Sequence, residues 1–140
     1  MPKSKLPVKK SQDHLPKNKQ PTLRLTTLPN DANLNGDIFG GWLMSKIDIA
    51  GAIAAVQRAN GPVATVAVTQ LQFIKPLFVY DLVSFYADII HVGRTSITVN
   101  IEVYAQRARA LFETVKVSEA KYVYVAVSTP GKKRVVPKMK

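Results

Sequence analysis

The chain has 140 residues, of which 46% are hydrophobic and 21% charged, so it suits a single globular domain with its own core. It contains no cysteine, which excludes a disulfide framework and a thiolate metal site. The formal net charge is +11, and the longest apolar run, residues 49–56, is far shorter than the roughly 20 residues that cross a membrane.

The excess positive charge is confined to the two ends of the chain. Residues 1–24 hold seven Lys or Arg and one Asp, residues 132–140 hold five Lys or Arg and no acid, and residues 25–131 hold eight of each sign. A basic arm attracts phosphates, but neither end contains an aromatic residue on which a base could stack. We therefore expect solvated ends on a neutral domain, with no nucleic acid and no membrane as partner.

The N-terminal region predicts a tail, a short strand, a loop and a helix, in that order. Residues 1–20 are rich in Lys and Pro and contain no signal-like apolar stretch, so we expect a disordered tail on a cytoplasmic protein whose domain spans 21–137. A strand near residues 23–27 leads into a loop at 29–37. A helix over 39–59 follows, with Asp37 as its N-cap, and its apolar residues on nearly all sides predict burial.

After residue 62 the apolar period changes from helical to two, which predicts strands. The predicted strands are 63–75, 82–92, 95–105 and one within 111–127. Consecutive strands joined by short turns favour an antiparallel sheet. A largely apolar helix needs more cover than a flat sheet gives, so the expected fold is α+β: a single hotdog domain, in which a curved antiparallel sheet wraps one long central helix. A second copy would cover the side of the helix that remains open.

Asp48 interrupts the apolar helix between Ile47 and Ile49. A carboxylate on a mostly buried helix is costly unless it is paired or hydrogen-bonded. The pattern alone leaves two interpretations open, a functional carboxylate or an Asp at a wet edge of the helix.

Two glycines, Gly40 and Gly41, lie at the predicted helix start. The first N–H groups of a helix are unpaired, and glycine lets a ligand approach them closely, so they could hold an oxyanion. A tight turn into the helix is the plainer interpretation. Asp48 lies roughly 10 Å further along the axis, so one substrate would have to reach both.

Residues 31–55, DANLNGDIFGGWLMSKIDIAGAIAA, resemble the helix signature of the YciA-type acyl-CoA thioesterases. Three later segments resemble strands of that family: 65–77, 93–104 and 118–127. The resemblance covers about residues 22–137 and implies hydrolysis of fatty acyl-CoA to the free acid and CoA, with CoA as part of the substrate and no other cofactor.

The resemblance also implies a site. Asp48 matches the family's helix Asp, and Asn33 matches the Asn of its loop motif; in the family these two come from opposite subunits of a dimer. Gly40 and Gly41 match the segment that polarises the thioester carbonyl. Arg94, Thr95 and Ser96 match the region that contacts the nucleotide part of CoA. The family implies a homo-oligomer of at least dimers, often a trimer of dimers.

The chemistry left open concerns the role of Asp48. The only histidines are His14 and His91, so neither a Ser-His-Asp set nor a metal site is expected. Where some relatives carry His-Gly-Gly this chain has Phe39, which excludes a mechanism that needs that His and argues against a hotdog dehydratase. Asp48 could act as a general base or attack the thioester directly.

The alternative function is a non-catalytic acyl-CoA binding or sensing protein. Trp42, Ile47 and Phe73 are candidate liners of an acyl slot.

Overall fold

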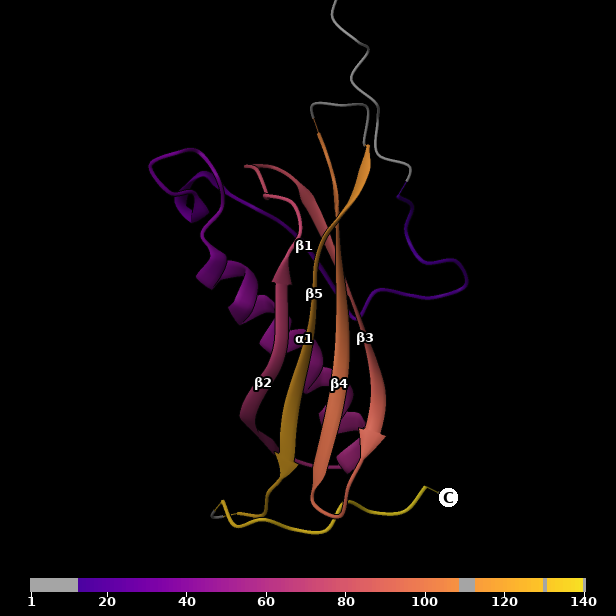
Figure 1. The fold of residues 1–140 in the computed structure, drawn as a ribbon. Helices are drawn as coiled ribbons and strands as arrows, with labels where there is room; N and C mark the ends of the chain where they lie inside the picture. Colours follow the sequence, from indigo (N-terminus) through magenta and orange to yellow (C-terminus); the bar gives the residue numbers. More distant parts are fainter. Residues whose placement is uncertain (1–12, 109–112, 130, 140) are drawn as a thin grey trace, which may run out of the picture.

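The computed structural model describes residues 13–108, 113–129 and 131–139. The elements run in the order β1 (Leu23–Thr26), α1 (Gly40–Ala59), β2 (Val63–Phe73), β3 (Leu82–Val92), β4 (Ser96–Gln106) and β5 (Thr114–Ala126), with a single 3-10 turn at Pro29–Asp31 before the helix. The five strands form one antiparallel sheet in the order β1-β3-β4-β5-β2. In Figure 1, α1 crosses one face of this sheet, so the predicted hotdog architecture is confirmed.

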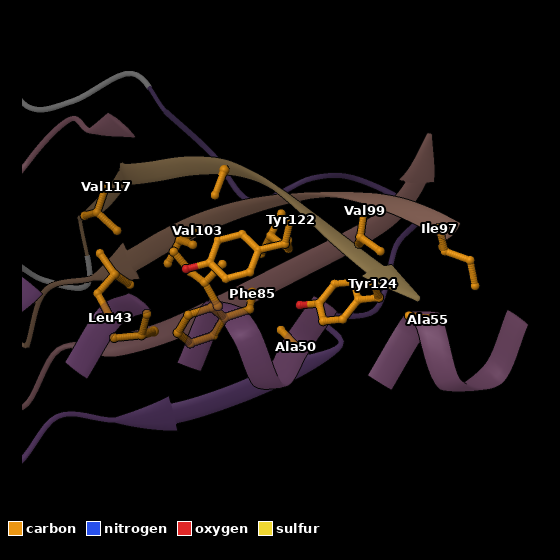
Figure 2. Packing of buried hydrophobic residues seen from close by; sticks show 14 of the residues in the cluster. Leu43, Ala50, Ala55, Phe85, Ile97, Val99, Val103, Val117, Tyr122 and Tyr124 are labelled. Carbon is orange, nitrogen blue, oxygen red and sulfur yellow. The ribbon is translucent and has the colours of Figure 1, made fainter. Parts of the chain in front are cut away.

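The core lies between α1 and the sheet face that covers it (Figure 2). The helix contributes Ile47, Ala50 and Ala55, all fully buried. In β4 the fully buried residues are Ile97, Val99, Ile101, Val103 and Ala105, and the residues between the first four are half-buried on the other face. This is the alternation that the sequence predicts for a strand with one face on the core.

The helix starts later than the sequence pattern predicts. Asp37 is not its N-cap: the N–H of Ile38 donates to the carbonyl oxygen of Leu77, so the chain is still paired with another segment there. The helix begins at Gly40 with Phe39 as N-cap, and the Phe39 side chain makes no capping hydrogen bond. The residue type of Asp37 suits an N-cap, but the backbone bond from the next residue to Leu77, about 40 positions away, keeps the chain out of the helix at that point.

The basic segments near both ends contact the domain. Lys19 pairs with Asp88 on the outer face of the sheet at 2.7 Å. At the other end, Arg134 donates to two backbone carbonyls and the neighbouring Val136 is buried. The charge pattern predicts a solvated C-terminal end, whereas these contacts place Arg134 and Val136 against the domain and leave Lys132, Lys133, Lys138 and Met139 exposed. Disorder was predicted for residues 1–20. Residues 13–20 are described and include Lys19, which pairs with Asp88, while residues 1–12 lie outside the described residues.

Over the part of the chain that the structure describes, no helix combines the length and the apolar content that crossing a bilayer requires.

Candidate active site

The loop before α1 holds Asn33 in a fixed orientation. The Asn33 side-chain oxygen accepts hydrogen bonds from the N–H groups of Asn35 at 2.8 Å and Asp37 at 3.2 Å. Its own N–H donates to the carbonyl of Asp37 at 2.7 Å. The loop therefore occupies the amide oxygen, and the Asn33 amino group is the part of the side chain left to donate to a ligand.

The start of α1 presents backbone N–H groups to an open surface. Phe39 has an extended conformation (φ −56°, ψ 136°) and supplies no side-chain cap. Gly40 and Gly41 are exposed, and a methyl group added at Gly41 would meet nothing within 4 Å. The first N–H groups of a helix have no intrahelical acceptor, and the helix dipole makes this end positive. The geometry suits binding of an oxygen that gains negative charge.

A pocket of about 320 Å³ joins the Asn33 loop to the helix start. Its lining residues are Asn33, Asp37, Ile38, Phe39, Gly40, Leu43, Phe73, Ile74, Lys75, Pro76 and Leu77. Asn33 and Gly40 therefore come together in one chain, whereas Gly41 and Asp48 are not in the lining. Of the three candidate acyl liners only Phe73 borders this pocket; Ile47 is fully buried in the core, and Trp42 packs half-buried with Lys46 over its ring.

A buried ion pair supports the far wall of this pocket. Asp81 is 2% exposed and pairs with the Arg107 guanidinium. Arg107 also donates to the carbonyl of Pro76 at 2.9 Å, and the N–H of Phe78 donates to Asp81. The segment after β2 is thereby tied to the end of β4. The sequence analysis missed this pair because its two members lie 26 positions apart with no local pattern linking them.

Asp48 is half-buried in the middle of α1 and has two defined partners. The Thr65 hydroxyl donates to the Asp48 carboxylate at 2.7 Å, and the Tyr124 hydroxyl donates to the Asp48 backbone carbonyl at 2.8 Å. Thr65 lies on the edge strand β2 and is exposed. The sequence analysis missed Thr65, although it shares the alternating phase of Val63, which packs on the core. A polar residue in that inward phase is the signal that could have identified it.

The region around Asp48 is open and apolar within one chain. Asp48 lies roughly 12 Å along the helix axis from Gly40, which explains its absence from the pocket. Six large apolar side chains on α1 and β2 are exposed: Met44, Ile49, Val56, Val66, Val68 and Phe73. The strand β2 is also an edge of the sheet, so its outer backbone groups face away from β5. Exposed apolar area beside an unpaired edge is typical of an interface.

The turn that carries Arg94, Thr95 and Ser96 lies at the opposite end of α1. It joins β3 to β4, and the N–H of Val136 donates to the Arg94 carbonyl at 2.9 Å. In Figure 1 this turn and the C-terminal segment lie beside the end of the helix, far from its start. One chain therefore does not bring Arg94 to Asn33. The Arg94 side chain is exposed, as are Lys132, Lys133 and Lys138 of the C-terminal segment.

The chemical groups available are the Asp48 carboxylate, the Thr65 hydroxyl, the Asn33 amide and the N–H groups of the helix start, and the pocket lining adds the side chains of Asp37 and Lys75. Among the residues that the structure describes, no group of three or more His, Cys, Asp or Glu side chains is arranged to hold a metal ion. Such a set can polarise an already activated carbonyl and deprotonate a water.

Comparisons with known proteins give one consistent family. The model of the family described as "Thioesterase superfamily" matches residues 35–111. The chain is 46% identical over 117 residues to the acyl-CoA thioester hydrolase YciA of Salmonella typhimurium, an alignment that covers 82% of this chain and 88% of the relative.

Two solved structures share the fold at high identity. The hexameric thioesterase y2039 of Yersinia pestis superposes with a TM-score of 0.82 at 46% identity, covering 87% of this chain and 98% of the other. A mutant of a hexameric broad specificity acyl-coenzyme A thioesterase superposes with a TM-score of 0.83 at 41% identity, covering 86% and 88%.

Proposed function

The chain belongs to the thioesterase superfamily and is an acyl-CoA thioester hydrolase, and from this premise we propose that Asp48 is the group on which its hydrolysis depends. The observation that carries this proposal is the Asp48 carboxylate itself, held by Thr65 at 2.7 Å on an otherwise apolar, open part of α1. The Thr65 bond engages one carboxylate oxygen, and the other oxygen of Asp48 can act on a substrate.

The mechanism that these groups support is attack by water on the thioester carbonyl carbon. Asp48 accepts the proton of the water, and the negative charge that develops on the carbonyl oxygen is stabilised by the N–H groups of Gly40 and Gly41. The Asn33 amino group donates to the water or to the carbonyl. The tetrahedral intermediate then collapses, the carbon–sulfur bond breaks, and the CoA sulfur leaves with the proton that Asp48 held.

Direct attack by Asp48 through an anhydride is the competing route. A single turnover in ¹⁸O-labelled water can identify the anhydride route. If water opens the anhydride at the Asp48 carbonyl carbon, the first acid product is unlabelled and the label enters Asp48. A labelled acid fits direct attack by water and also opening of the anhydride at the acyl carbon, and trapping the anhydride with hydroxylamine separates those two.

A complete site requires a second copy of the chain in this proposal. Asn33 and Gly40 line one pocket, while Asp48 lies about two turns away beside exposed apolar residues of α1 and β2. A second copy placed across β2 would cover these residues and bring its own Asp48 to the first chain's pocket. The hexameric relatives agree with a homo-oligomer, and a trimer of dimers is the assembly we propose.

The nucleotide part of CoA is assigned to the other end of α1. Arg94 is exposed at the β3–β4 turn, next to a C-terminal segment whose Lys132, Lys133 and Lys138 are also exposed. The three phosphate groups of CoA are the anionic part of this substrate, and guanidinium groups pair well with phosphate oxygens. Thr95 and Ser96 of the same turn could add hydroxyl donors.

The first experiment measures thiol release from acyl-CoAs of increasing chain length, for wild type, Asp48→Asn and a control, Asp88→Asn. Removing a general base typically costs about 10²- to 10⁴-fold in rate, so Asp48→Asn is expected to lose that much kcat. Asp88→Asn removes a carboxylate on the outer face of the sheet and is expected to keep wild-type kcat. Full activity in a folded Asp48→Asn would rule out the assignment.

Mixing two inactive variants tests the shared site. In a dimer of Asp48→Asn with Asn33→Ala, one site receives both wild-type residues and the other receives both substitutions. Random exchange of subunits should restore about a quarter of the native sites. If each chain carried a whole site, the mixture would stay as inactive as its components.

A further inference from the structure

Two tyrosines of β5 donate hydrogen bonds into the backbone of α1. The Tyr122 hydroxyl lies 3.2 Å from the carbonyl oxygen of Met44, and the Tyr124 hydroxyl lies 2.8 Å from that of Asp48. The two rings are stacked with their centroids 6.4 Å apart, and Figure 2 shows them side by side over α1. Because the acceptors are four residues apart, the two bonds hold successive turns on the same side of the helix.

The helix makes room for the Tyr124 hydroxyl at Gly51. A methyl group added there would lie 2.2 Å from the hydroxyl oxygen and 2.9 Å from the ring carbon that bears it. Glycine in a helix interior is unfavourable relative to alanine. Gly51 therefore lowers the intrinsic stability of the helix, but any side chain at this position would push the Tyr124 hydroxyl away from the Asp48 carbonyl.

The strand register places both partners of Asp48 on one cross-strand pair. Thr65 of β2 lies directly opposite Tyr124 of β5. Directly opposed residues point to the same face of a sheet, and here that face is the one covered by α1. The register shifts between Thr65 and Ala67, which marks a β-bulge, a device that redirects a side chain. Asp48 is therefore held at its carbonyl by Tyr124 and at its carboxylate by the residue paired with Tyr124.

We propose that Tyr124 is a positioning residue for hydrolysis, because its hydroxyl fixes the height and rotation of the helical turn from which the Asp48 carboxylate reaches Thr65 and the substrate. This inference rests on the proposed catalytic role of Asp48. In an α-helix the Asp48 carbonyl already accepts the N–H of residue 52, so the tyrosine bond is additional to the helix and is not needed to form it. The Tyr124 bond therefore affects the position of the helical turn that carries Asp48.

The donor is available at every pH at which the protein would be assayed. Tyr124 is fully buried, and this burial, together with the negative charge of Asp48, raises the pKa of its hydroxyl well above the usual range. The hydroxyl therefore stays protonated and acts only as a donor to the carbonyl.

Tyr124→Phe and Tyr122→Phe form a matched pair for the test. Each removes one hydroxyl from the same strand and the same stacked pair, but only the Tyr124 hydroxyl bonds the carbonyl of Asp48 itself. Misplacing a catalytic group by about 1 Å can cost up to 10²-fold in rate, so we expect Tyr124→Phe to lower kcat about tenfold. The KM for acyl-CoA should stay within about twofold, since the pocket and the CoA contacts are intact, and Tyr122→Phe should keep kcat within about twofold.

The midpoint of thermal unfolding is measured for both variants, because a purely structural role of the two hydroxyls predicts similar losses of stability and of kcat in both. Equal kcat in the two Phe variants would assign the hydroxyls to packing and overturn the inference. Wild-type kcat in Tyr124→Phe, with Asp48→Asn inactive, would overturn it and leave the catalytic role of Asp48 standing. Full activity of Asp48→Asn would remove both proposals together.

A second variant breaks the same bond from the helix side. Gly51→Ala keeps the tyrosine but pushes its hydroxyl away from Asp48. A folded Gly51→Ala is expected to show the same fall in kcat with the KM retained, and wild-type kcat in this variant would contradict the proposal as well.

Discussion

The two ends of α1 are built in opposite ways. At its start, Phe39 offers no side-chain cap, Gly40 and Gly41 are exposed, and Gly40 lines a pocket. At its end, Asn60 takes the left-handed conformation, and its N–H donates to the carbonyl of Val56. There Arg134 donates to the carbonyl of Ala59 at 2.8 Å. One end keeps its polar groups available for a ligand, whereas the other end satisfies them within the chain.

This difference shows which end is expected to serve chemistry and which stability. The N–H groups at an exposed helix start have no intrahelical acceptor, so they can bond either water or an oxygen of a ligand. A carbonyl end closed by an arginine and by a left-handed residue anchors the helix. Asp48 lies between them, roughly 12 Å from Gly40 and 16 Å from Ala59 along the axis. The anchored end therefore fixes the helix that carries both the Asp48 carboxylate and the N–H groups of the open end.

The largest expected effect comes from removing one N–H at the open end. Gly40→Pro deletes that donor while leaving the helix able to form, because proline is favoured at the first helical position. Phe39 already has the extended conformation that a residue before proline prefers. Loss of one oxyanion donor typically costs about 10²- to 10³-fold in kcat, and we expect a loss of that order here.

Gly40→Ala is the control for this substitution. It keeps the N–H, and its methyl group would meet the Phe73 ring at 3.5 Å, an ordinary contact. We expect kcat within a few-fold of wild type. If the Ala and Pro variants have the same kcat and both fold, the Gly40 N–H does not stabilise the oxyanion.

The closed end is tested by Arg134→Met, which removes donors to the carbonyls of Ala59 and Val127. Hydrogen bonds from a charged group contribute about 1.5–3 kcal/mol, so the free energy of unfolding should fall by about 2 kcal/mol. Urea unfolding at fixed protein concentration measures it, with Lys133→Met as an exposed control. The kcat of the folded enzyme should not change; a large fall in kcat with normal stability would show that this end takes part in chemistry.

A smaller effect is expected at the basic turn beside the closed end. Arg94→Ala should raise the KM for acyl-CoA about fivefold, equivalent to about 1 kcal/mol of lost phosphate binding. The matched measurement uses the same acyl group on pantetheine, which lacks the nucleotide. There the KM should be the same in mutant and wild type. An unchanged KM for both substrates would exclude contact between Arg94 and CoA.

Sequence patterns identify those parts of this molecule that depend on local order. The alternation in β3 predicted the strand 82–92 with the bounds that the structure has, and the all-round apolar helix ended at Ala59 as Asn60, Gly61 and Pro62 predict. These features depend on side-chain period and on backbone preferences of single residues. The glycine pair at the helix start indicated Gly40, the resemblance added Asn33, and one pocket brings the two together.

The remaining features depend on contacts between distant parts of the chain. The N-cap was predicted at Asp37, whereas the structure has Phe39, because the Ile38–Leu77 bond depends on how the loop meets the sheet. Thr65 reaches Asp48 only through the register and the bulge of β2, and Arg134 closes a helix end 75 positions away. No pattern in a short window contains such pairs. The position of Asp48 relative to Asn33 needs a second chain, which one sequence does not describe.

The smallest expected effect lies at Asn60, whose φ of 51° and ψ of 48° place it in the left-handed region. Asparagine tolerates this conformation better than most residues, but glycine has no Cβ to strain it. We expect Asn60→Gly to raise the free energy of unfolding by about 0.5 kcal/mol and Asn60→Ala to lower it by about 1 kcal/mol. Both variants should keep wild-type kcat, because the change is confined to the anchored end. If Asn60→Gly were instead destabilising, the Asn60 side chain itself would have to contribute to closing the helix, and the contrast between the two ends would then be even greater than the backbone bonds alone make it.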